Sequence, residues 1–151
     1  MYKVLLVDDE YMVTEGLKRL IPFEKWDMQV VATANHADDA LDYVKENPVD
    51  VIISDVNMPD KTGLEMIKEM KEILPDAYYI LLSGYQEFDY VKKAMNLSVV
   101  DYLVKPVDKV ELSHLLEKIA SQLQEKVEQS QTLSQELDEE GFVNFLAGKN
   151  N

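Results

Sequence analysis

Five short apolar runs alternate with stretches of helical periodicity over roughly the first 120 residues, and this alternation restricts the possible fold more than any other feature. Val51, Ile52 and Ile53 show the pattern best, because successive β-branched residues without polar alternation are typical of a strand buried on both faces. The expected strands are 3–7, 29–34, 49–54, 77–83 and 99–104, and the expected helices are 14–21, 37–47, 63–74, 87–97 and one that begins near Asp108. This order predicts an α/β fold with a doubly wound parallel sheet, right-handed crossovers and helices on both faces.

The composition argues against several classes of protein. The chain has 29 acidic and 15 basic residues and a formal net charge of -14, so the phosphate backbone of a nucleic acid would repel it. Cysteine is absent, which excludes disulfides, thiol catalysis and zinc–thiolate sites and fits a cytoplasmic location. The apolar run Val4 to Val7 is too short for a signal peptide, and no other run could span a membrane.

The C-terminal part of the chain differs from the rest. After about Ile119 the sequence is polar and rich in Gln and Glu, and a heptad register from 112 to 137 has apolar residues at six of its eight positions. We expect 121–151 to form a helical linker, with a weak two-stranded coiled coil as one form and a solvated tail as the alternative. The final stretch "GFVNFLAGKNN" is typical of the start of another element.

Polar side chains follow four of the expected strands at the point where each strand ends. Asp8 and Asp9 follow the first strand, Asp55 the third, Ser83 ends the fourth, and Lys105 follows the fifth. In an open parallel sheet, ligands bind beyond the carboxyl ends of the strands, where the strand order reverses. These side chains therefore converge if their strands are neighbours.

This set of side chains suits a phosphoryl group and a metal ion. Three carboxylates brought together repel one another, and Mg²⁺, which prefers oxygen ligands, offsets that repulsion. Lys105 adds a positive charge and Ser83 a hydroxyl donor. Asp55 is the candidate nucleophile, because it stands alone on the central strand while Asp8 and Asp9 form a pair suited to the metal. Each residue alone could be a helix cap or a surface residue, so the prediction depends on their combination.

Four motifs in the same order resemble the receiver domain of bacterial two-component response regulators. They are "LLVDDE" (5–10), "DVNMPDKTGLEMI" (55–67), "LLSGY" (81–85) and "DYLVKPV" (101–107). The resemblance covers about residues 1–120, which we take as the receiver domain. It implies a flavodoxin-like (CheY-like) five-stranded sheet of order 2-1-3-4-5, extended here by a long C-terminal helix. It also implies a regulatory module rather than an enzyme, with a sensor histidine kinase as its partner.

The resemblance assigns roles to individual residues. Asp55 would be the phosphoacceptor, and Mg²⁺ would be held by Asp8, Asp9, Asp55 and the backbone carbonyl of Asn57. The remaining implied roles are phosphoryl binding by Ser83 and Lys105, switching by Ser83 and Tyr102, and a cis peptide bond at Lys105–Pro106. The chain departs from the family pattern at Ser98, where glycine is usual, and in the sequence "MPDKTG" (58–63) of the loop after Asp55.

Two segments resemble a subgroup of these regulators whose output domains are AraC-type DNA-binding domains. They are "LSGYQEFDYVKKAM" and the insert "IPFEKWDMQVV". The resemblance implies that DNA is contacted only through an output domain that is not within these 151 residues, where no helix-turn-helix is visible. It also implies a homodimer, formed either through the face made by 87–97, 99–104 and the helix after Asp108, or through the C-terminal helix.

Two other functions compete with this interpretation. A pseudo-receiver would use the same fold as an unphosphorylated protein-interaction module, and it is disfavoured because all the expected site residues are present. A Mg²⁺-dependent phosphatase with an aspartyl nucleophile usually carries a second aspartate two residues after the first. That position is Asn57 here, which disfavours the phosphatase.

Overall fold

The computed structural model describes residues 1–84 and 100–136. The chain divides into two compact units, Met1–Leu115 and Leu116–Asn151. The elements are β1 (Tyr2–Val7), α1 (Tyr11–Leu20), the 3-10 helix η1 (Phe23–Trp26), β2 (Met28–Ala34), α2 (Ala37–Glu46), β3 (Val51–Asp55), α3 (Gly63–Ile73), β4 (Tyr78–Ser83), β5 (Val100–Val104) and α5 (Lys109–Glu136). The helix expected at 87–97, Ser98 and the final apolar stretch lie outside the described residues.

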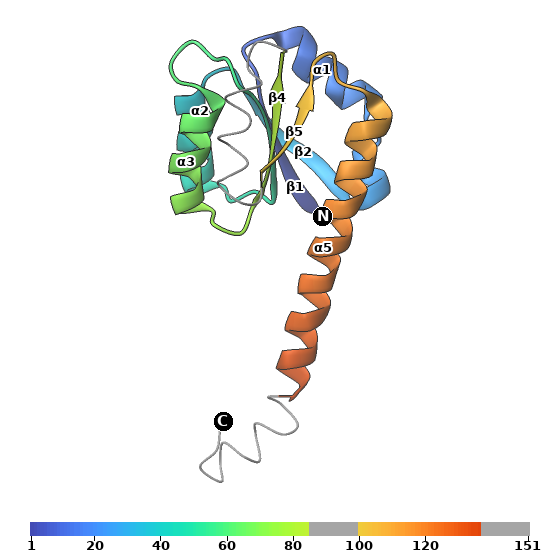
Figure 1. The fold of residues 1–151 in the computed structure, drawn as a ribbon. Coiled ribbons are helices and arrows are strands. Elements are labelled where there is room, and N and C mark those ends of the chain that lie inside the picture. The colour runs from blue at the N-terminus through green and yellow to red at the C-terminus, as the bar shows by residue number, and fades with distance from the viewer. Residues whose placement is uncertain (85–99, 137–151) are drawn as a thin grey trace. The chain divides into compact units, whose positions relative to one another are not determined.

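The five strands form one parallel sheet in the order β2-β1-β3-β4-β5. This confirms the predicted flavodoxin-like fold, in which β1 and β3 are central neighbours. Helices α2 and α3 pack together on one face of the sheet and α1 lies on the other (Figure 1). None of the described helices has the length and apolar character needed to cross a membrane.

The prediction for the first helix was wrong at its start. The apolar spacing predicted residues 14–21, but α1 begins at Tyr11. Tyr11 and Met12 are 69% and 80% exposed, so they add nothing to a buried stripe. Thr14 is buried instead, and its hydroxyl donates to the Tyr11 carbonyl at 3.0 Å. The first turn therefore lacks the pattern of buried apolar residues by which a helix is recognised in a sequence.

The last helix begins close to where it was expected. The Asp108 carboxylate accepts the backbone N–H groups of Val110 at 2.8 Å and Glu111 at 3.1 Å, so Asp108 acts as the N-cap. Helix α5 then runs for 28 residues, which matches the extended C-terminal helix in the predicted fold. In the second unit, the described residues are the part of this helix that ends at Glu136.

The hydrophobic core lies on both faces of the central strands. Every residue of β3 is buried, including Ser54 and Asp55 at its carboxyl end. Between the sheet and the α2–α3 face, Ile52, Met66 and Ile67 are fully buried. Burial of an apolar side chain of this size contributes roughly 1.5–3 kcal/mol to stability. This packing is what fixes the position of the polar end of β3.

Gly63 lets helix α3 approach the end of β3. Its N–H donates to the Val56 carbonyl at 2.7 Å, directly after the Thr62 N-cap. A Cβ atom on Gly63 would collide with the backbone carbonyl oxygen of Asp55 and would lie 3.1 Å from the Leu81 side chain. A backbone oxygen cannot move aside as a flexible side chain can, so this position requires glycine.

We expect Gly63→Ala to lower the free energy of unfolding by about 1–3 kcal/mol, the range for overpacked sites. Gly16→Ala in α1 is the matched control, because nothing lies within 4 Å of a Cβ atom there. Alanine is the better helix former, so this variant should gain about 0.5–1 kcal/mol. Urea unfolding followed by circular dichroism measures both changes. A Gly63→Ala protein as stable as the wild type would show that the close approach is unimportant.

Candidate functional site

The strand register brings the carboxyl ends of the central strands to one edge of the sheet. Val7 pairs with Ser54, and Asp55 pairs with Leu82, so the residues that follow β1 lie beside the end of β3. The segment after β5 is fixed to β4 by a 2.7 Å hydrogen bond from the Lys105 N–H to the Ser83 carbonyl. The polar residues predicted at these strand ends therefore come from adjacent strands.

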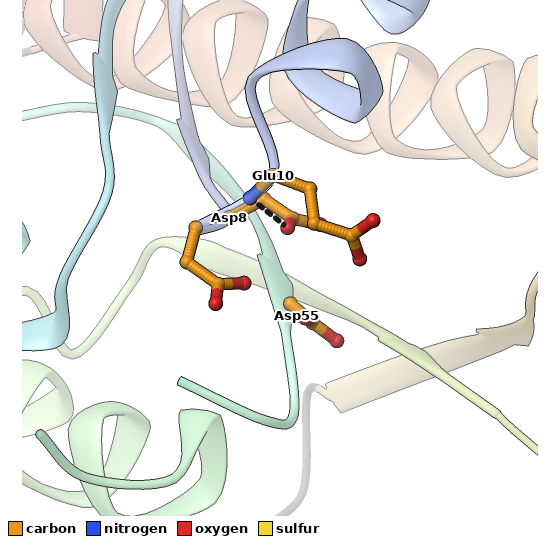
Figure 2. Close-up of side chains that lie close together, drawn as sticks. Asp8, Glu10 and Asp55 are labelled. Atoms are coloured by element: carbon orange, nitrogen blue, oxygen red, sulfur yellow. Dashed lines mark hydrogen bonds between the residues drawn. The ribbon is translucent and has the colours of Figure 1, made fainter. Parts of the chain in front are cut away.

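Four carboxylates gather at this edge. One carboxylate oxygen from each of Asp8, Asp9, Glu10 and Asp55 lies within 4.8 Å of the others. Figure 2 shows Asp8 and Glu10 after β1, next to Asp55 at the end of β3. The dashed line in Figure 2 is the 2.9 Å bond from the Glu10 N–H to Oδ1 of Asp8. Asp8 and Asp55 are buried, while Asp9 and Glu10 are exposed.

The Lys105 ammonium lies among these carboxylates. Its Nζ is 3.2 Å from Oδ2 of Asp8, 3.3 Å from Oδ1 of Asp55 and 3.8 Å from Oε1 of Glu10. The Lys105 side chain is 23% exposed, so these contacts are only partly screened by water. One cation therefore bridges the ends of β1 and β3. The Lys105–Pro106 peptide bond that follows β5 is cis.

The two buried acids of the cluster both have raised pKa values, mainly because they are buried. Burial raises the pKa of Asp55, and the charge of Asp8 raises it further. Burial also raises the pKa of Asp8, although the Glu10 N–H and Lys105 partly offset this. Burial opposes the charge of Lys105, but the attraction of Asp55 and Asp8 outweighs it and raises the pKa of the ammonium. Four carboxylates surround this one ammonium, so the acids outnumber the base at the site.

The donor set fits a hard divalent cation. All four groups offer carboxylate oxygens, the ligand type that Mg²⁺ prefers, and one edge of the cluster is open to water. Burial and the charge of Asp8 raise the pKa of Asp55, and a bound cation would oppose both effects by favouring the charged carboxylate. The residues present thus agree with the predicted metal and with its expected place in the fold.

The other predicted site residues lie around this cluster. Ser83 is buried at the end of β4. Asn57 is exposed in the loop after β3, and its backbone N–H donates a hydrogen bond to the Asp55 carboxylate. Tyr102 on β5 is half-buried and packs against the core cluster on the α2–α3 side. The predicted residues Asp8, Asp9, Asp55 and Lys105 form the cluster itself.

Sequence reasoning missed Glu10. It belongs to the carboxylate cluster and approaches Lys105, but it was not among the predicted metal or phosphoryl residues. The signal was present, since Glu10 is the third acidic residue in succession after β1. A strand end continues into a loop of unknown direction, so the sequence alone does not show that the third side chain turns back to the site.

A family model described as "Response regulator receiver domain" matches residues 4–117. The chain belongs to this receiver-domain family. It is therefore a regulatory module of the two-component type, and receiver domains generally bind Mg²⁺ at an acidic pocket such as this one.

Curated relatives and solved structures agree with the family. A response regulatory protein of Staphylococcus epidermidis is 36% identical over 126 residues, which are 83% of this chain and 49% of that protein. The transcriptional regulatory protein HptR of Staphylococcus aureus is 33% identical over 86% of this chain and 51% of its own length. This receiver chain thus spans about half the length of these relatives.

Two of the similar solved structures are receiver-type proteins of named regulators. The REC domain of AraT, a response regulator from Geobacillus stearothermophilus, has a TM-score of 0.78 and 37% identity, covering 83% of this chain and 97% of that one. A two-component transcriptional regulator AraC from Clostridium phytofermentans has a TM-score of 0.75 and 28% identity, covering 82% of this chain and 98% of that one.

The raised pKa values predict how stability depends on pH. In the folded receiver, Asp8 and Asp55 bind protons more tightly than in the unfolded chain, where the ordinary pKa of an aspartate is 3.8. Stability therefore falls as the pH rises from below that value through the raised folded pKa values, and the loss persists at neutral pH. Asp55→Asn removes the part of this loss of stability that comes from ionising Asp55. We expect it to raise the free energy of unfolding at neutral pH by about 1 kcal/mol, a usual size for one substitution.

Urea unfolding in a chelator, at neutral pH and at a pH below 3.8, measures this difference. The gain should shrink at the lower pH, because both states are then protonated at Asp55. Asp76→Asn is the control, since Asp76 is exposed and precedes β4 at the opposite edge of the sheet. A destabilised Asp55→Asn protein at neutral pH would contradict the raised pKa of Asp55.

Proposed function

We propose that this receiver domain accepts a phosphoryl group on Asp55 from the phosphohistidine of a sensor histidine kinase. Mg²⁺ would be held by the carboxylates of Asp8, Asp9 and Asp55 and by the backbone carbonyl of Asn57. The observation that carries the proposal is the cluster of carboxylates around the Lys105 ammonium at the ends of β1 and β3. A purely structural ion pair would not need four acids for one cation.

In the transfer step, a carboxylate oxygen of Asp55 attacks phosphorus in line with the phosphohistidine nitrogen. The new bond joins that oxygen to phosphorus, the phosphorus–nitrogen bond breaks, and the leaving imidazole keeps the electron pair and takes up a proton. A bound Mg²⁺ supplies charge neutralisation for the carboxylates and the phosphoryl oxygens. Lys105 already contacts Asp55 at 3.3 Å, so its ammonium needs only a short movement to reach a phosphoryl oxygen on that carboxylate.

Ser83 and Tyr102 would then change conformation in response to the phosphoryl group. The new anion draws the Ser83 hydroxyl toward it, and the ring of Tyr102 follows into the space that Ser83 leaves. Support comes from their places on neighbouring strands, since Ser83 ends β4 and Tyr102 lies on β5, half-buried against the core cluster. Phosphorylation shifts the equilibrium between two surfaces only if it stabilises one of them more than the other.

Incubation with a small acyl-phosphate donor and Mg²⁺ tests the transfer. We expect one base-labile phosphoryl group per chain, located on Asp55 by mass spectrometry. Asp55→Asn should abolish the label. Lys105→Ala should lower the labelling rate by about a hundredfold, the usual cost of removing one preorganised donor. Asp76→Asn is the matched control and should label as the wild type does.

The same assay separates the competing functions. A pseudo-receiver would take up no label under any condition. A Mg²⁺-dependent phosphatase would turn over unrelated phosphate esters continuously rather than hold one phosphoryl group. Either result from the wild-type protein would contradict the proposal.

We also propose that the chain is part of a longer AraC-type transcription regulator, with a receiver domain at 1–120 and a helical linker at 121–151. Support comes from the AraT and AraC regulators among similar structures and from the greater length of the curated relatives. The transcriptional regulatory protein YesN of Bacillus subtilis is 35% identical over only 33% of its length. DNA would be contacted through the output domain, and the histidine kinase and DNA partners together imply the cytoplasm.

Phosphorylation should change the oligomeric state. The proposed dimer forms through the face that includes β5 and the start of α5, or through the C-terminal helix. We expect gel filtration with light scattering to show a shift from monomer toward dimer when beryllofluoride, a phosphoryl mimic, is added with Mg²⁺. Asp55→Asn should not respond. An unchanged mass for the wild type at high concentration would count against the dimer.

A further inference from the structure

The loop between β3 and α3 is fixed at both ends. At its start, the Val56 N–H donates to the Leu82 carbonyl at 3.0 Å, and the Val56 carbonyl accepts the N–H of Gly63 at 2.7 Å. At its end, Thr62 and Glu65 form a capping box with bonds of 3.1 and 3.0 Å. Residues 57–61 between these anchors carry Asn57, which follows the Asp55 side chain by two positions.

The tip of this loop is tied to a different helix. Oδ1 of Asp60 accepts the N–H of Ala37 at 3.1 Å, and Oδ2 of Asp60 accepts the N–H of Asp38 at 2.8 Å. These are the first N–H groups of α2, which have no partner within the helix. His36, the N-cap residue of α2, makes no side-chain capping bond. Asp60 therefore caps α2 although it belongs to a distant part of the chain, the loop between β3 and α3.

Charge reinforces this tie. Lys61 Nζ lies 3.2 Å from Oδ1 of Asp38 on α2 and 2.7 Å from Oε2 of Glu69 on α3. Slight burial opposes ionisation of Asp60, but the N–H bonds from Asp38 and Ala37 outweigh it and lower the pKa of Asp60. The carboxylate is thus fully ionised at neutral pH, when it accepts both N–H groups.

The loop has little freedom to absorb a change at Asp60. Only Met58 and Pro59 separate Asn57 from Asp60, and the ring of Pro59 fixes one backbone dihedral. The Asn57 N–H donates to the Asp55 carboxylate, so the peptide at Asn57 is already part of the site. A shift of the loop tip would move the backbone of Asn57, both its N–H and its carbonyl.

We propose that Asp60 is a positioning residue, which binds the first N–H groups of α2 and thereby holds the Asn57 backbone where it contacts the metal and Asp55. This inference rests on the proposed function, because it assumes that the Asn57 carbonyl is a Mg²⁺ ligand. Asp60 is not among the four clustered carboxylates, and its side chain bonds the start of α2 instead. It sets the affinity for Mg²⁺ and the rate of phosphoryl uptake through the loop.

The test compares Mg²⁺ binding to Asp60→Ala, Asp60→Asn and a control. Partners that orient a metal ligand typically contribute 10- to 100-fold to metal affinity, so we expect Asp60→Ala to weaken Mg²⁺ binding about tenfold in isothermal titration calorimetry. Asp60→Asn keeps one acceptor oxygen and should lie between Asp60→Ala and the wild type. Salt high enough to screen surface charges removes the effect of the lost charge alone.

Asp50→Ala is the matched control. The Asp50 carboxylate also accepts a backbone N–H, that of Lys3 at 2.8 Å, but it precedes β3 at the opposite edge of the sheet. Asp50→Ala loses the same type of side chain, the same charge and the same kind of hydrogen bond as Asp60→Ala. We expect this control to keep the Mg²⁺ affinity of the wild type. Phosphoryl uptake by Asp55 from an acyl phosphate should slow in Asp60→Ala and not in Asp50→Ala.

The outcomes separate this inference from the proposed function. If the wild type binds Mg²⁺ and takes up the label but Asp60→Ala equals Asp50→Ala, the positioning role is wrong and the proposed function stands. If the wild type itself does neither, the proposed function fails. Circular dichroism checks folding, and if Asp60→Ala is unfolded, wild-type affinity in folded Asp60→Asn overturns the inference.

Discussion

The repulsion among carboxylates at the ends of β1 and β3 is the constraint on which the rest of the structure depends. Asp8 and Asp55 are buried beside each other, and burial together with their mutual repulsion raises the pKa of Asp55. Lys105 offsets part of this repulsion, at 3.2 and 3.3 Å from the two groups. The remainder must be opposed by the apolar packing of the central strands. A site that is unfavourable by itself is typical of one that gains stability when a cation binds.

Close packing, a helix cap and ion pairs together fix the loop that follows β3 at this edge of the sheet. Gly63 allows α3 to contact the backbone at Asp55, where any side chain would collide. Asp60 ties the intervening loop to α2, and Lys61 joins α2 to α3. The residues that follow β3 are therefore connected to two helices on one face of the sheet. Within the segment "MPDKTG", Asp60 and Lys61 therefore both make defined contacts.

Much of the fold could be predicted because the signals were local. Successive β-branched residues such as Val51 to Ile53 exclude an exposed strand, and the apolar spacing of α2 and α3 gave their bounds to within one residue. The start of α1 was missed, because Thr14 faces inward while Tyr11 and Met12 face water. Pattern reasoning assumes that apolar residues are buried, and it fails where a helix begins with the opposite arrangement.

The sequence by itself determined the residue types at the strand ends, and the alternation of strands and helices implied that Asp8, Asp55 and Lys105 would converge if their strands were neighbours. Only the tertiary structure decided which contacts the loops around these residues make. Glu10 turns back to Lys105, and Asp60 reaches α2 across 23 positions of sequence. Such contacts depend on the direction of a loop, and that direction is set by the packing of whole helices rather than by any local pattern of residues.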